Sequence, residues 1–339
     1  MNVVFWGTPE YSVPSLKAIV NNGYNVIGIV TQPDKRRTRG NKFSYSPVKK
    51  IGIDLSIPVF TPTRIRDESE VRSKILELEA DIYIVVAFGQ ILPIEVLNRP
   101  KLGCWNAHAS LLPKWRGAAP IQRSIINGDK ETGVNIIYME EGLDTGPILL
   151  EKKIQINITE NSIQLSKRLS EISAELLVDT ISLIQEQYKR LGVFDTQRLD
   201  LSKQSNVSDN SSYAKIIDKK EYLINWNQKS YDISNKVRGL YPNAYTTISG
   251  KRVKVLCTKS LESIRYNDQV HYNSLKSISY NSNNLEPGLI IDRHHQHGIT
   301  VLTGDSPIII REAQIEGKKP TSGNKLVQQL GTIESLKFE

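Results

Sequence analysis

Three side chains that could together polarise an oxygen atom and move a proton stand in two short segments of the chain. Asn106 and His108 are two positions apart in the segment 103–120, GCWNAHASLLPKWRGAAP, and side chains two apart in an extended strand point to the same face. Asp144 stands in the segment 142–147, GLDTGP, whose glycines and proline predict a turn that can approach a ligand closely. An amide donor, a titratable imidazole and a carboxylate can therefore meet at one place.

A structural explanation of the same residues is that His108 is a hydrogen-bonded core histidine and that Asp144 caps its turn. The order of the residues favours a functional explanation. This order resembles the signature of the folate-dependent formyltransferases: Asn106, His108, the run SLLP at 110–113 and then Asp144. The flanking run KWRGAAPI at 114–121 strengthens the resemblance. It covers nearly the whole chain, and within the family it is closest to the members that act on methionyl initiator tRNA.

The resemblance implies transfer of a formyl group from 10-formyltetrahydrofolate, as cosubstrate, to the α-amino group of methionine carried by initiator tRNA. Asn106 and His108 are the natural donors to the oxygen of the tetrahedral intermediate, where one donor is worth about 2.7–4 kcal/mol. Asp144 would hold His108 protonated and relay the proton of the amine through water. Such a transfer needs no covalent enzyme nucleophile, no metal and no tightly bound cofactor.

Three other functions are compatible with the same catalytic run. A formyltransferase could act on a small amine, such as glycinamide ribonucleotide or an amino sugar nucleotide, and would need no basic surface for RNA. A formyltetrahydrofolate hydrolase would release formate without any acceptor. The last alternative is an RNA-binding module with an inactive catalytic scaffold, which the intact set of Asn106, His108 and Asp144 disfavours.

A candidate folate slot follows the strand expected at 81–87. Phe88, Gly89, Ile91 and Leu92 stand at the carboxyl end of that strand, where open α/β sheets bind their ligands. The resemblance implies that they line the pterin slot together with Ser110, Leu111, Leu112 and Pro113. For the apolar side chains of the first group, plain core packing is the alternative.

A strongly basic segment spans residues 32–50. It holds seven basic residues against a single acid, Asp34, for a net charge of +6. A solvated loop is the usual explanation of such a run, but the resemblance implies that this loop enters the acceptor end of the tRNA and that Arg39, before Gly40, contacts the first mispaired bases. The tRNA-binding residues that we predict in this loop are Lys35, Arg36, Arg37, Arg39 and Lys42.

The composition is that of a protein with two domains. The chain has 339 residues, 39% of them hydrophobic and 24% charged, and a net charge of +8, which suits a polyanionic partner but does not specify one. Its two cysteines, Cys104 and Cys257, lie too far apart for a thiolate zinc motif and indicate a reducing compartment. We find no membrane-spanning run and no leader, so we expect a cytoplasmic protein without membrane contact, and a monomer.

The first half of the chain predicts an α/β fold. The order of strand 2–6, helix 12–22 and strand 25–31 is a β-α-β unit. The pattern continues with a helix at 67–79, a strand at 81–87, further strands at 134–139 and 148–158, and a long helix at 159–188. We therefore predict a Rossmann-like, doubly wound, mostly parallel sheet. This catalytic domain should cover residues 1–190, and a polar linker should cover 191–208.

The second half, residues 209–339, predicts a small β-domain. Short segments separated by turns indicate strands at 223–225, 245–248, 253–258, 289–292, 298–302 and 307–313, with a helix at 231–240. The resemblance implies an OB-like barrel that binds tRNA. Its net charge of +5 suits an RNA backbone, although a basic face without a partner is also possible. The composition of the segment 260–284 indicates a loop insertion, and the run HHQH at 294–297 lacks the spacing of a metal site.

Overall fold

The structure is a computed structural model that describes residues 1–36, 43–205, 213–260, 286–294, 298–331 and 337–339. The chain forms two compact units. The first contains residues 1–120, 131–155 and 166–215, and the second contains residues 121–130, 156–165 and 216–339. Each unit is described below by itself. No helix among the described residues is both long enough and apolar enough to cross a membrane.

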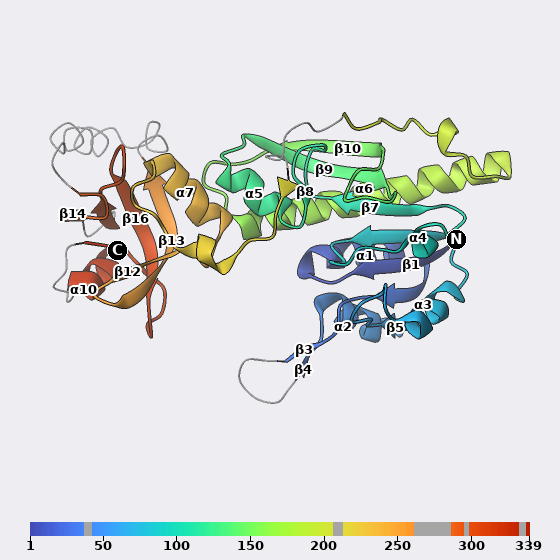
Figure 1. Cartoon of the computed structure of the whole chain (residues 1–339), viewed down its shortest axis with the longest axis horizontal. Coiled ribbons are helices and arrows are strands. Elements are labelled where there is room, and N and C mark those ends of the chain that lie inside the picture. Colours follow the sequence, from blue (N-terminus) through green and yellow to red (C-terminus); the bar gives the residue numbers. More distant parts are fainter. Residues whose placement is uncertain (37–42, 206–212, 261–285, 295–297, 332–336) are drawn as a thin grey trace. The chain divides into compact units, whose positions relative to one another are not determined.

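A seven-stranded sheet forms the centre of the first unit, in the order β10-β9-β7-β6-β1-β2-β5 (Figure 1). Five neighbouring strands pair in parallel, and β9 and β10 add two antiparallel strands at one edge. The strands are β1 (Asn2–Gly7), β2 (Asn25–Val30), β5 (Val59–Phe60), β6 (Ile82–Val86), β7 (Cys104–His108), β9 (Glu131–Tyr138) and β10 (Ile148–Gln155). The predicted doubly wound, mostly parallel α/β fold is confirmed.

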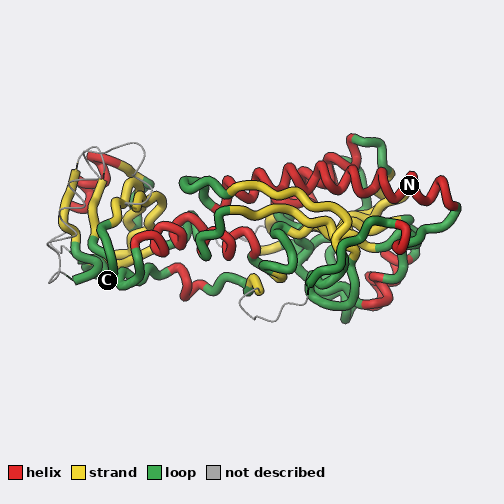
Figure 2. Tube along the Cα trace, turned by 90° about the horizontal axis from the view of Figure 1, so that it is seen from above, coloured by secondary structure: helices red, strands yellow, loops and turns green. Residues whose placement is uncertain are grey.

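The apolar strands are buried because helices cover both faces of the sheet. All five residues of β6 are buried, and one face of β1, with Val4 and Trp6, packs against Ile75 and Val96 of two helices. The helices of this unit are α1 (Val13–Asn21), α2 (Pro47–Asp54), α3 (Ser69–Leu76), α4 (Ile94–Leu97) and α6 (Ser162–Leu191). The long helix α6 runs beside β9 and β10 in both views of the fold (Figures 1 and 2), and Lys152 of β10 forms an ion pair with Glu175 of α6 at 2.6 Å.

The basic segment is only partly a loop, so the prediction that the loop extends to residue 50 was wrong. Strands β3 (Lys35–Arg36) and β4 (Phe43–Ser44) pair as a short antiparallel ladder, and α2 begins at Pro47, where the side chain of Ser46 accepts a hydrogen bond from the Lys49 amide. A serine cap followed by proline at the first helical position is a strong start signal. Lys49 and Lys50 therefore belong to a helix, and Lys49 pairs with Asp34 at 2.7 Å.

The second unit is built on an antiparallel sheet in the order β12-β13-β16-β15-β14, with β17 paired to β16. Its strands are β12 (Tyr245–Ile248), β13 (Lys251–Ser260), β14 (Ile290–His294), β15 (Gly298–Val301), β16 (Ile308–Ile315) and β17 (Thr321–Ser322). This unit also contains three helices and a 3-10 turn: α5 (Pro120–Ile126), α7 (Ser230–Gly239), α10 (Gly323–Gly331) and η4 (Lys219–Tyr222). The predicted separate β-domain is confirmed.

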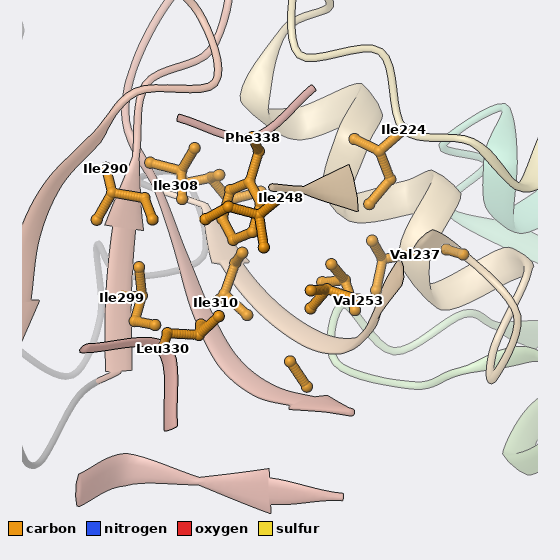
Figure 3. Packing of buried hydrophobic residues seen from close by; sticks show 14 of the residues in the cluster. Ile224, Val237, Ile248, Val253, Ile290, Ile299, Ile308, Ile310, Leu330 and Phe338 are labelled. Atoms are coloured by element: carbon orange, nitrogen blue, oxygen red, sulfur yellow. The ribbon is translucent and has the colours of Figure 1, made fainter. Parts of the chain in front are cut away.

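Its core consists mainly of branched aliphatic side chains from both the sheet and the helices (Figure 3). Ile299 and Ile310 lie opposite each other on β15 and β16, and Val237 of α7 and Leu330 of α10 are fully buried with them. The strand predicted at 223–225 was wrong, because Leu223 forms only an isolated bridge to Tyr245. Apart from Ser260, the predicted insertion at 260–284 lies outside the described residues, as do His295 and His297.

Candidate active site

Asn106, His108 and Asp144 meet at the carboxyl end of β7. Nδ1 of His108 lies 3.5 Å from Oδ2 of Asp144, and Nδ2 of Asn106 donates a hydrogen bond to Oδ1 of Asp144 at 3.3 Å. The exposed fraction is 9% for Asn106 and 5% for His108, and 13% for the side chain of Asp144. Asn106 and His108 share one face of the strand as their spacing predicts, and the turn places the carboxylate between them.

The second ring nitrogen of His108 faces the backbone. Nε2 lies 3.0 Å from the carbonyl oxygen of Trp115, and Trp115 has a positive φ of 65°, a conformation that L-residues adopt at a cost in energy. Both nitrogens of the ring thus lie against acceptors, a carboxylate on one side and a carbonyl on the other. An imidazole protonated on both nitrogens would satisfy both.

The turn that carries Asp144 is shaped by close backbone approaches. Asp144 itself has a positive φ of 55°, and its Oδ2 accepts a hydrogen bond from the backbone N–H of Gly117 at 2.9 Å. A Cβ at position 146 would collide with the carbonyl oxygen of Tyr138, so only glycine fits there. Gly146 thus allows the turn to lie close against β9, an approach that the sequence indicated only as a turn.

Gln204 and Arg116 contact or adjoin this turn. The sequence did not indicate Gln204, and Arg116 entered only as a member of the run at 114–121, without a role. The amide nitrogen of Gln204 donates to the carbonyl oxygens of Asp144 and Gly146, at 2.8 and 2.7 Å. Its amide oxygen accepts from Nε and Nη2 of Arg116, at 3.0 and 2.6 Å. Gln204 stands in a polar segment that looks like a linker, so no local pattern could have identified it.

The residues predicted for the folate slot differ widely in exposure. Phe88 and Leu92 are buried members of the core under the sheet, and Phe88 packs edge-on against Trp6 with ring centroids 5.2 Å apart. The side chain of Ile91 is 70% exposed, and Gly89 takes a positive φ of 85°. Core packing therefore explains Phe88 and Leu92, whereas Ile91 is available to a ligand.

The run at 110–113 is fixed by polar contacts. Ser110 Oγ donates to the carbonyl of Lys114 at 2.6 Å, and the backbone N–H of Leu112 donates to Oδ1 of Asn135 at 2.6 Å. Ser110 and Leu112 are buried, while Leu111 and Pro113 are half-buried. Asn135 on β9, which the sequence did not indicate, thus holds the segment that follows His108.

Of the predicted tRNA-binding residues, Lys35 and Arg36 form β3. Arg37, Arg39 and Lys42 lie outside the described residues. The base of this segment is anchored: Thr31 Oγ1 and Ser46 Oγ are 2.8 Å apart, and Asp34 pairs with Lys49.

Comparison with protein families gives two matches that together cover most of the chain. The model described as "Formyl transferase" matches residues 1–181, and the model described as "Formyl transferase, C-terminal domain" matches residues 216–331.

Curated relatives match the chain over nearly its full length. A protein of Prochlorococcus marinus named methionyl-tRNA formyltransferase is 47% identical over 345 residues, which cover 99% of this chain and 98% of the relative. A protein of a Synechococcus species with the same name is 44% identical over 332 residues, which cover 97% of this chain and 100% of the relative.

Solved structures with the same fold have lower identity. The sugar 3N-formyl transferase WlaRD, solved in the presence of dTDP and 5-N-formyl-THF, has a TM-score of 0.59 and 19% identity, covering 94% of this chain and 99% of that one. HypX from Aquifex aeolicus in complex with tetrahydrofolic acid has a TM-score of 0.56 and 13% identity, covering 99% of this chain and 50% of that one. At these identities the likeness shows the fold.

Proposed function

Because the chain belongs to the formyl transferase family, we propose that it is the enzyme that transfers the formyl group of 10-formyltetrahydrofolate to the α-amino group of methionyl initiator tRNA. The observation that carries this proposal is the full-length identity of 44–47% with relatives named methionyl-tRNA formyltransferase. Asn106 and His108, which both contact Asp144, supply with it groups suited to the chemistry.

The transfer needs a polarised formyl oxygen. The Asn106 amide uses one proton of Nδ2 in its bond to Asp144 and has a second proton for the oxygen. His108 is the other donor in the proposed mechanism. In the described conformation its Nε2 faces the carbonyl of Trp115, so the formyl oxygen would have to replace that carbonyl as the acceptor. Two preorganised donors would then stabilise the negative charge that develops on this oxygen.

The transfer also needs proton movement at two nitrogens. The α-amino group must lose a proton before or during its attack on the formyl carbon, and the folate nitrogen must gain one when its bond to that carbon breaks. We assign to Asp144, acting through water, the relay of the proton from the amine to the leaving folate nitrogen, and to the same carboxylate the fixing of the His108 ring. No bond between enzyme and formyl group is required.

Substrate binding is assigned to two further sets of residues. Ile91, Leu111 and Pro113 retain exposed surface, and Leu111 and Pro113 closely follow His108 in sequence. We propose that these three contact the pterin, with Gly89 and the backbone beside Phe88, Ser110, Leu112 and Leu92 shaping the slot. We propose Lys35, Arg36, Arg37, Arg39 and Lys42 as contacts for the acceptor end of the tRNA. The domain assignment 1–190, 191–208 and 209–339 belongs to this proposal.

The decisive experiment is a formylation assay with 10-formyltetrahydrofolate and three acceptors: methionyl initiator tRNA, methionyl elongator tRNA and an amino sugar nucleotide. We expect N-formylmethionine on the initiator tRNA, with a kcat/KM at least about tenfold above that for the other two acceptors. Formate is measured in parallel with tRNA omitted. Formylation of the amino sugar alone, or formate release independent of acceptor, would refute the proposal.

A further inference from the structure

One side chain connects the turn of Asp144 to the segment on the other side of its carboxylate. The Gln204 amide donates both of its protons to the turn, to the carbonyls of Asp144 and Gly146. Its oxygen takes two hydrogen bonds from the Arg116 guanidinium. The amide has two donors and two acceptor positions, and all four are used in these contacts.

The same contacts fix the hydrogen bonds of the carboxylate itself. Arg116 directly precedes Gly117, whose backbone N–H donates to Oδ2 of Asp144 at 2.9 Å. Arg116 is buried, with 8% of its surface exposed, so its position is closely defined. Gln204 therefore binds the backbone of Asp144 directly. It also binds Arg116, the residue next to Gly117, whose N–H donates to the Asp144 carboxylate.

The segment around Gln204 is attached to the sheet. Ser202 and Ile148 exchange two backbone hydrogen bonds, of 2.9 and 2.8 Å. Further along, β11 (Tyr213–Ala214) pairs in parallel with β8 (Arg116–Gly117). The carbonyl of Ala214 accepts bonds from the N–H groups of Ala118 and Ala119, at 2.9 and 3.1 Å. The bonds of Ser202, two residues before Gln204, thus attach this part of the segment to the sheet.

We propose that Gln204 is a positioning residue for the formyl transfer. It acts through Asp144, by holding the turn at the distance at which the carboxylate meets Asn106, His108 and the Gly117 amide. Without the two donated bonds the turn would relax, because two partly buried carbonyls would lack their partner. A displacement of about 1 Å at a catalytic group costs about a hundredfold in rate, so the effect should appear in kcat. This inference rests on the proposed function.

The test compares Gln204→Leu and Gln204→Glu with the wild type. Leucine removes all four hydrogen bonds, whereas glutamate keeps the acceptor for Arg116 and loses the donors to the turn. We expect both variants to lower kcat by about tenfold to a hundredfold, with KM for folate and for tRNA within about threefold of the wild type. If the leucine variant does not fold, the glutamate variant decides.

Gln187→Leu is the matched control. Gln187 is also a side-chain amide that clamps backbone, with bonds to the carbonyl and N–H of Asp195 at 3.0 and 3.3 Å. We expect it to lower the melting temperature without changing kcat by more than about twofold. A second readout is the effect of Gln204→Leu in an Asp144→Asn background, measured by single turnover. If Gln204 acts through the carboxylate, its effect there should fall below about threefold.

Wild-type kcat in Gln204→Glu, or losses that multiply in the double variant, would overturn the inference. An increase in KM with kcat unchanged would also overturn it, because it would indicate a substrate contact instead. A wild-type protein that transfers no formyl group would refute the proposed function rather than the role of Gln204. The two failures are therefore distinguishable.

Discussion

At the scale of single residues, hydrogen-bond donors surround the carboxylate of Asp144. Its two oxygens lie near three donors or potential donors, the amide of Asn106, the N–H of Gly117 and Nδ1 of His108. An ionised carboxylate can accept all of them, whereas an amide in its place would turn one donor toward another. This arrangement orients the imidazole and is the basis of the first prediction.

We expect His108→Ala to lower kcat by about a hundredfold to a thousandfold, the range found when a single transition-state donor is removed. Asp144→Asn should lower kcat by about a hundredfold or more, because it removes the carboxylate that orients this donor and relays the proton. The dissociation constant for tRNA should change by less than about threefold, because neither side chain belongs to the basic surfaces. Steady-state formylation and equilibrium tRNA binding measure the two effects.

Asp195→Asn is the control for these variants, because Asp195 caps the 3-10 turn η2 (Thr196–Arg198) by accepting from the Gln197 N–H. Its kcat should equal that of the wild type. If His108→Ala or Asp144→Asn retained near-normal turnover, that residue would have no part in the mechanism.

At the scale of elements, an ion pair connects α5 and η4 within the second unit. The Arg123 guanidinium donates two hydrogen bonds to the Glu221 carboxylate, at 2.6 and 2.9 Å, a bidentate geometry that is stronger than a single contact. The hydrogen bond from Arg123, helped by the backbone N–H of Asp218, lowers the pKa of Glu221 below its ordinary value. The pair must therefore contribute a stability that depends on pH.

The sign of this dependence follows from the lowered pKa. The stabilisation is present above the ordinary pKa of a glutamate and is lost as the pH falls through the lower pKa of the folded state. We expect Glu221→Gln to reduce the free energy of unfolding at pH 7 by about 0.2–1 kcal/mol, since the pair is partly exposed. Denaturant titrations along a pH series should show this difference vanishing in acid. Glu171→Gln, at an exposed position of α6, is the matched control for the loss of one carboxylate.

The core of the antiparallel sheet gives a larger effect. Ile310 is fully buried between β13 and β15 (Figure 3), so Ile310→Ala should reduce the free energy of unfolding by about 2–5 kcal/mol through lost burial and a residual cavity. Ile216, which is 77% exposed, is the matched control, and Ile216→Ala should stay within about 0.5 kcal/mol. Equal losses in the two variants would mean that Ile310 does not belong to the core.

At the scale of the whole molecule, charge is the property that suits the proposed substrate. The net charge of +8 is shared between the basic segment 32–50, at +6, and residues 209–339, at +5, while the remainder is slightly acidic. Lys49 belongs to α2 and is paired with Asp34, so part of the charge in the basic segment is already compensated. The charges that can reach RNA phosphates are therefore fewer than the sequence count.

We expect Arg39→Ala to raise the KM for tRNA by about tenfold, while the KM for folate stays unchanged. If Arg39 neutralises a phosphate, the slope of log affinity against log salt should fall by about one unit. Arg190→Ala, on the exposed end of α6, is the control and should change neither constant. Equal effects on both substrates would contradict the assignment of this segment to tRNA.

The amino-acid sequence by itself determined the α/β and β character of the two halves, many of their elements, and which three polar residues to consider together. The strand at β12 and helix α7 were predicted to within one residue, because period-two and period-3.6 patterns are local. Asn106 and His108 were placed on one face by their spacing, and Asp144 by its turn. The resemblance to the family motif indicated that these three residues form one catalytic set.

Only the tertiary structure decided what surrounds them. Three contacts join residues that no local pattern relates. The carbonyl of Trp115 lies against His108, Asn135 binds the N–H of Leu112, and Gln204 binds the turn of Asp144. A glutamine in a polar segment has the same local pattern whether it is solvated or bound. Its role arises from long-range packing, in which Ser202 pairs with Ile148 and brings that segment against the sheet.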